Sequence, residues 1–129
     1  MTTAAYIKEK KKKVPRHYRD GANFERRVKA HLESELEQTY KGTSIKHYII
    51  RAAGSRGHLD LVILLTNTAL QEQEVIGIQC KIKRPSYIQM KKFISKVLHK
   101  TGVRTYYAFK QGRVIDFYPP IHSKEEFII

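Results

Sequence analysis

The chain has 129 residues, enough for one domain of ordinary size, and its hydrophobic fraction of 41% suffices for a globular core. Its 25 basic and 12 acidic side chains give a net charge of +13, which predicts a polyanionic partner, nucleic acid ahead of an anionic membrane. We expect neither a signal peptide nor a membrane span, because no apolar run approaches the ~18 residues that a span needs. The single cysteine, Cys80, excludes an internal disulfide and favours an intracellular, cytoplasmic protein.

Residues 1–19 form a basic arm that is separate from the domain expected over residues 20–129. Its lysine run consists of Lys10, Lys11, Lys12 and Lys13. Like-charge blocks of this kind are usually disordered in isolation, so the arm is either a solvated tail or a segment that grips phosphates and orders on DNA.

A helix is predicted from Asp20, a plausible N-cap, to just before Gly42, a plausible stop. Its apolar residues recur at helical spacing and form a single stripe, which comprises Phe24, Val28, Leu32 and Leu36. Glu25 falls inside this stripe. A carboxylate on the core-facing side of a helix is costly unless it is paired or binds a metal, so Glu25 is a candidate functional residue.

The remaining chain alternates strand and helix patterns. Strands are predicted at 45–51, 59–65, 75–82, 103–109 and 113–118, with a hairpin turn at 110–112 and an amphipathic helix over 86–100 that ends near Gly102. The order α-β-β-β-α-β-β predicts an α/β fold with a mixed sheet and helices on its faces.

Three polar residues on neighbouring predicted strands carry the chemistry. Gln79 and Lys81 are two residues apart and therefore share a face of their strand. If the second and third strands form a hairpin, Asp60 lies opposite Gln79 or opposite Lys81, and either register brings the three groups within about 5–8 Å. The alternative is that Asp60 is a local cap and Lys81 a solvated strand residue.

This grouping suits phosphodiester cleavage with Mg²⁺, or with Mn²⁺ as another hard divalent cation. Asp60 would supply a charged oxygen ligand, Gln79 a neutral carbonyl oxygen and Cys80 its backbone carbonyl. Lys81 would orient the attacking water or stabilise charge on the phosphate. Glu25 could reach the same metal or bind a second one, whereas the Cys80 side chain is expected to be a core residue.

Three stretches of the chain resemble the PD-(D/E)xK nuclease superfamily, and within it archaeal Holliday-junction resolvases and their viral relatives. These stretches are GANFERRVKAHLE, RAAGSRGHLDLVIL and GIQCKIKR, which stand in the family's order across residues 21–84. The resemblance implies a restriction-endonuclease-like fold. It also implies a homodimer that cuts a four-way DNA junction.

The resemblance further implies roles for individual residues. Glu25 matches a helix-one glutamate, Asp60 the metal-binding aspartate, Lys81 the catalytic lysine and Ser55 a serine close to the scissile phosphate. Residues expected to contact DNA are Arg26, Arg51, Arg56, Lys83 and Arg84, together with the lysines of the arm.

One residue departs from the family pattern. Gln79 stands where relatives usually carry Glu or Asp, which removes one negative charge from the expected metal site. Three hypotheses therefore remain open: a junction-selective nuclease, a nuclease that cuts or nicks other DNA, and a nucleic-acid-binding module without catalysis.

Overall fold

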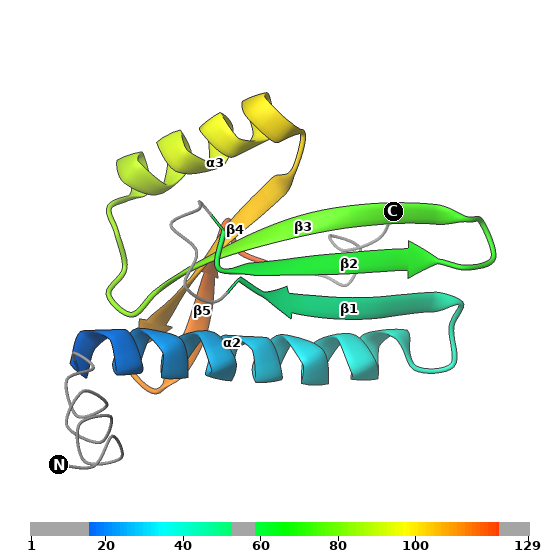
Figure 1. Cartoon of the computed structure of the whole chain (residues 1–129), viewed down its shortest axis with the longest axis horizontal. Helices are drawn as coiled ribbons and strands as arrows, with labels where there is room; N and C mark the ends of the chain where they lie inside the picture. Colours follow the sequence, from blue (N-terminus) through cyan, green and yellow to red (C-terminus); the bar gives the residue numbers. More distant parts are fainter. Residues whose placement is uncertain (1–15, 53–58, 122–129) are drawn as a thin grey trace, which may run out of the picture.

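The computed structural model describes residues 16–52 and 59–121 of the chain. It contains two helices and five strands, in the order α2 (Arg16–Tyr40), β1 (Ile45–Arg51), β2 (Leu61–Asn67), β3 (Glu72–Lys81), α3 (Tyr87–Thr101), β4 (Arg104–Gln111) and β5 (Val114–Tyr118) (Figure 1). This is the predicted order of elements, and it confirms the α/β fold class.

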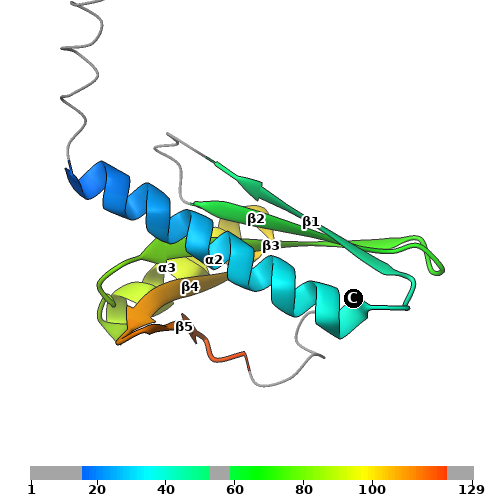
Figure 2. The ribbon, with the colours of Figure 1, turned by 90° about the horizontal axis from the view of Figure 1, so that it is seen from below.

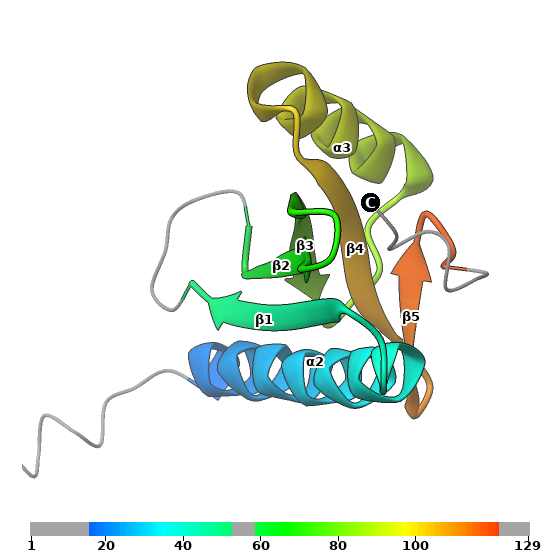
Figure 3. The ribbon, with the colours of Figure 1, turned by 90° about the vertical axis from the view of Figure 1, so that its right-hand side faces the viewer.

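The five strands form one mixed sheet in sequence order. The first three strands form an antiparallel meander, in which Leu61 of β2 pairs with Arg51 of β1 and with Ile78 of β3. β4 runs parallel to β3, so that α3 serves as the crossover between them, and β5 returns antiparallel to β4. Figure 3 shows α2 and α3 on opposite faces of this sheet.

α2 packs on one face of the sheet through the predicted apolar stripe. From Phe24 onward every fourth residue of the helix is buried, and these residues are Phe24, Val28, Leu32, Leu36 and Tyr40. They contact the even-numbered side chains of β3 and the odd-numbered ones of β2 in a single core cluster. Figure 2 shows the helix lying obliquely across the strands.

α3 covers the other face beside β4. Met90 of α3 packs with Tyr107 and Phe109 of β4 in a second, smaller core cluster. The helix begins with a capping box, in which the Ser86 hydroxyl accepts a hydrogen bond from the Gln89 backbone and the Gln89 side chain reaches back. It ends at Gly102, whose φ of 73° lies in the left-handed region where glycine is favoured.

Several predicted boundaries are wrong. α2 begins at Arg16, so Asp20 lies inside the helix instead of capping it, and residues 16–19 of the expected arm are helical. The added turn is exposed, and an ion pair between Arg16 and Asp20, at 3.9 Å and four residues apart, supports it. The turn predicted at 110–112, between β4 and β5, comprises Gly112 and Arg113, because Gln111 already pairs with Val114.

No helix in the described ranges is long and apolar enough to cross a membrane. Residues 1–15 lie outside the described part of the chain, and with them the lysine run of the predicted arm.

Candidate functional site

Asp60 stands immediately before β2 and is held by three hydrogen bonds. Its backbone nitrogen donates to the Ile78 carbonyl at 2.9 Å, and its carbonyl accepts from the Ala52 nitrogen at 2.9 Å. Its carboxylate oxygen Oδ2 accepts a hydrogen bond from the Cys80 backbone nitrogen at 2.8 Å. The carboxylate therefore takes the Cys80 hydrogen bond that the backbone of a residue before Asp60 would accept if the ladder continued.

Gln79 and Lys81 lie on the face of β3 that α3 covers. Their neighbours Ile78 and Cys80 point into the α2 core, and side chains alternate along a strand. The ladder between β2 and β3 begins with Leu61 opposite Ile78, which leaves Asp60 level with Gln79 and not with Lys81. Lys81 is exposed, whereas the Gln79 oxygen Oε1 is buried and has no hydrogen-bond partner among the described residues.

Glu25 approaches this region from α2, on the other face of the sheet. Its carboxylate lies 3.2 Å from Nε of Arg51, at the end of β1. Both side chains are largely buried, with 19% of Glu25 and 20% of Arg51 exposed. This ion pair explains how a carboxylate is tolerated inside the apolar stripe, and the sequence pattern did not predict the partner.

Electrostatic coupling links the members of the site through Asp60. Burial raises the pKa of the Glu25 carboxyl, and the Asp60 charge raises it further, against the effect of Arg51. Burial also raises the pKa of Asp60, while the Cys80 hydrogen bond and the charges of Lys81 and Arg51 oppose this shift. The Asp60 charge thus raises the free energy of the charged form of Glu25.

The donor set fits one hard divalent cation. Asp60 retains oxygen lone pairs beyond its bond to Cys80, and the buried Gln79 Oε1 lacks a donor. The Cys80 carbonyl points to the same side of β3 as the Cys80 nitrogen, toward Asp60, because both groups of one strand residue face the same neighbour. The described residues contain no cluster of three or more His, Cys, Asp or Glu side chains.

The sequence pattern did not predict two packing features around Asp60. A Cβ atom added to Gly77 would lie 2.7 and 2.8 Å from the two terminal carbons of Leu59, so the glycine makes room for the residue before Asp60. Tyr107 lies beside Gln79 in the parallel ladder and is only 5% exposed. Burial raises the pKa of its phenol, and the Asp60 charge contributes to the shift.

The other predicted residues are placed around this site or lie outside the described part of the chain. Arg26 is exposed on α2, and Lys83 and Arg84 are exposed after β3. Ser55, Arg56, Lys10, Lys11, Lys12 and Lys13 fall in the ranges that the structure does not describe.

The Cys80 side chain belongs to the α2 core, as predicted. It is 9% exposed, and burial together with the Asp60 and Glu25 charges raises the pKa of its thiol. A thiol held in its neutral form is a poor nucleophile, so the chemistry of this residue lies in its backbone groups.

The fold and the site together define an α/β protein with a charge-coupled polar cluster where β2 begins and β3 ends. No family model matches the chain, and neither a curated protein nor a solved structure gives a significant match. The functional conclusion therefore depends on the geometry of this cluster and on the charge of the chain.

Proposed function

We propose that the protein is a metal-dependent nuclease that hydrolyses phosphodiester bonds in DNA. Within this class, we propose a structure-selective endonuclease of the Holliday-junction resolvase type, active as a homodimer inside the cell. The single observation that supports the proposal best is the position of Asp60, whose carboxylate is held at the Cys80 nitrogen of β3 and lies level with Gln79.

Each residue has a role that follows from its position. Asp60, Gln79 and the Cys80 carbonyl would hold Mg²⁺, which when bound polarises the phosphate and acidifies a water molecule. Lys81 is exposed and close enough to stabilise the Asp60 charge, so its ammonium can also stabilise charge that develops on a phosphate. Arg51 holds Glu25, which makes Glu25 a supporting carboxylate and not a free ligand.

The decisive variant is Asp60→Asn. The asparagine side-chain oxygen can still accept the Cys80 hydrogen bond, so the fold is retained while the metal-binding charge is lost. We expect cleavage of a synthetic four-way junction in Mg²⁺ to fall about 10² to 10³-fold, with junction binding in EDTA little changed.

A matched control is Asp116→Asn on β5. The Asp116 carboxylate also accepts a backbone hydrogen bond, from the Phe117 nitrogen at 2.9 Å, but this residue lies outside the site. The control should cleave like the parent protein. Undiminished cleavage by the Asp60 variant would refute the nuclease assignment.

A binding module without catalysis is the second candidate function. It is favoured by the neutral Gln79 and by the lack of a third carboxylate in the described cluster. Gln79→Glu separates the two functions, because it restores the charge beside Asp60. If the protein is a nuclease, the parent already cleaves DNA. We then expect the Gln79→Glu variant to reach half-maximal cleavage at an Mg²⁺ concentration about 10 to 100-fold lower.

The control for that variant is Gln73→Glu, the same change on an exposed residue of the same strand. It should leave the Mg²⁺ dependence unaltered. Cleavage that is absent from the parent and present only in the Gln79 variant would favour the binding module. Comparison of a junction with nicked and linear duplexes at fixed salt would measure the structure selectivity.

A further inference from the structure

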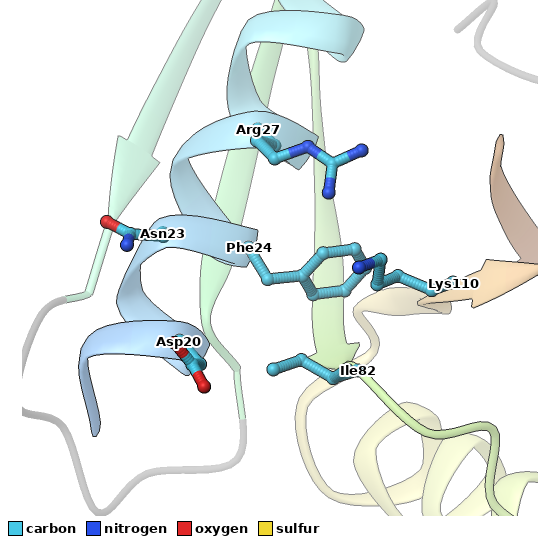
Figure 4. Close-up of a pocket in the computed structure, with 6 residues that line it drawn as sticks. All are labelled: Asp20, Asn23, Phe24, Arg27, Ile82 and Lys110. Atoms are coloured by element: carbon cyan, nitrogen blue, oxygen red, sulfur yellow. The ribbon is translucent and has the colours of Figure 1, made fainter. Parts of the chain in front are cut away.

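A hollow on the α2 side of the sheet lies between the first turns of the helix and the end of β3. Its lining residues are Asp20, Asn23, Phe24, Arg27, Ile82 and Lys110 (Figure 4). In the wall opposite α2, the Lys110 nitrogen of β4 donates a hydrogen bond to the carbonyl of Ile82, just after β3, at 3.3 Å. The hollow is therefore formed by elements that are fixed to one another.

Two basic side chains enter this hollow from opposite walls. Figure 4 shows Arg27 extending from α2 and Lys110 extending from β4, with the Phe24 ring level with Lys110 and Ile82 below. Within the described residues neither cation forms an ion pair. Positive groups over an apolar floor concentrate their field, which favours an anion that enters the hollow.

The acidic residue at the rim weakens this field only in part. The Asp20 carboxylate lies 3.9 Å from Nε of Arg16, one turn earlier on the same helix, and is 54% exposed. Its charge is therefore shared with another cation and screened by water.

The hollow adjoins the candidate site along both chain segments. Phe24 precedes Glu25, and Ile82 follows Lys81. Ile82 lines the hollow and directly follows Lys81, the last residue of β3, so the hollow and the Lys81 side chain both lie at the end of this strand. A polymer of phosphates that crosses the strand end would meet both.

We propose that this hollow binds one backbone phosphate of the nucleic acid, next to the phosphate at Asp60. The guanidinium of Arg27 can donate two parallel hydrogen bonds to the phosphate oxygens, and Lys110 adds a point charge. The identity of the polyanion rests on the proposed function. The hollow itself is an anion site that the proposed catalytic residues do not need.

The test is the salt dependence of DNA binding by the double variant Arg27→Gln and Lys110→Gln. Fluorescence anisotropy with a labelled four-way junction in EDTA, from 50 to 200 mM NaCl, gives the slope of log K against log salt. Loss of one phosphate contact should reduce the slope by about 0.9. Far-ultraviolet circular dichroism shows whether the variant retains its fold.

The matched control is the double variant Lys46→Gln and Lys100→Gln. It removes the same charge from exposed residues at the start of β1 and near the end of α3. Its slope should equal that of the parent protein, since a general effect of net charge would alter both variants alike.

The outcomes separate this inference from the proposed nuclease activity. A reduced slope confined to the hollow variant supports the phosphate site, even if the parent fails to cleave DNA in Mg²⁺. If the hollow variant has the same salt slope as the parent protein, or if both variants lose the same amount of slope, the phosphate site is overturned. Cleavage of DNA by the parent would still support the nuclease in that case. Absence of DNA binding by the parent overturns both.

Discussion

Gly77 leaves room for the side chain of Leu59, the residue before Asp60. A Cβ atom added to the glycine would lie 2.7 and 2.8 Å from the terminal carbons of Leu59, and 3.1 Å from the Thr105 hydroxyl. An added methyl group must therefore displace the ends of the Leu59 side chain. The backbone of Asp60 is held separately, by hydrogen bonds to Ala52 and Ile78.

We expect Gly77→Ala to lower the free energy of unfolding by about 1 kcal/mol, because the methyl group must displace the ends of the flexible Leu59 side chain. Urea denaturation measures this change. The control is Gly21→Ala in α2, where an added Cβ meets nothing within 4 Å. That change should stabilise the helix by up to about 1 kcal/mol, and equal behaviour of the two variants would contradict the packing argument.

At the scale of elements, α3 depends on its ends more than α2 does. α3 buries few residues, chiefly Met90 and Val97, and is held at its start by the capping box of Ser86 and Gln89. α2 instead buries five residues along one stripe, which stabilises it without a described cap. Loss of the N-terminal cap should therefore lower the stability of α3.

Ser86→Ala should destabilise the protein by about 1 kcal/mol, because the Gln89 nitrogen loses its acceptor. Thermal unfolding followed by circular dichroism reports the change. Ser34→Ala, on the exposed face within α2, is the control and should be neutral or slightly stabilising. A midpoint unchanged by the Ser86 substitution would show that the tertiary contacts of α3 suffice.

At the scale of the whole molecule, the net charge of +13 acts against the compact state. A few ion pairs oppose this repulsion, among them Arg104 with Glu74 at 2.7 Å and Arg51 with Glu25 at 3.2 Å. Repulsion among many exposed cations acts over longer distances than these contacts, so salt should reduce the repulsion more than it weakens the pairs.

We therefore expect the thermal midpoint to rise as NaCl increases from about 10 mM to about 100 mM, where the screening length falls from ~30 to ~10 Å. Differential scanning calorimetry in metal-free buffer measures the midpoint. A neutral osmolyte series at constant salt provides the control for general solvent effects. A midpoint that falls with salt would mean that the ion pairs dominate.

The sequence by itself determined the order of the elements, the apolar stripe of α2 and the placement of Gln79 and Lys81 on one face of their strand. These features follow from local periodicity, since spacing along a helix or strand fixes which residues share a face. It also placed Cys80 in the core and indicated Asp60 as a candidate metal ligand. Element boundaries were less accurate, as the early start of α2 shows.

Only the tertiary structure decided how Asp60 is held, which cation pairs with Glu25, and which residues meet in the hollow beside them. Arg51 is 26 positions from Glu25, and the Cys80 nitrogen is 20 positions from Asp60. Contacts of this kind arise from strand register and from the packing of a helix on a sheet, which no local pattern encodes. Burial, and with it the raised pKa of both carboxyls, is likewise a property of the assembled fold.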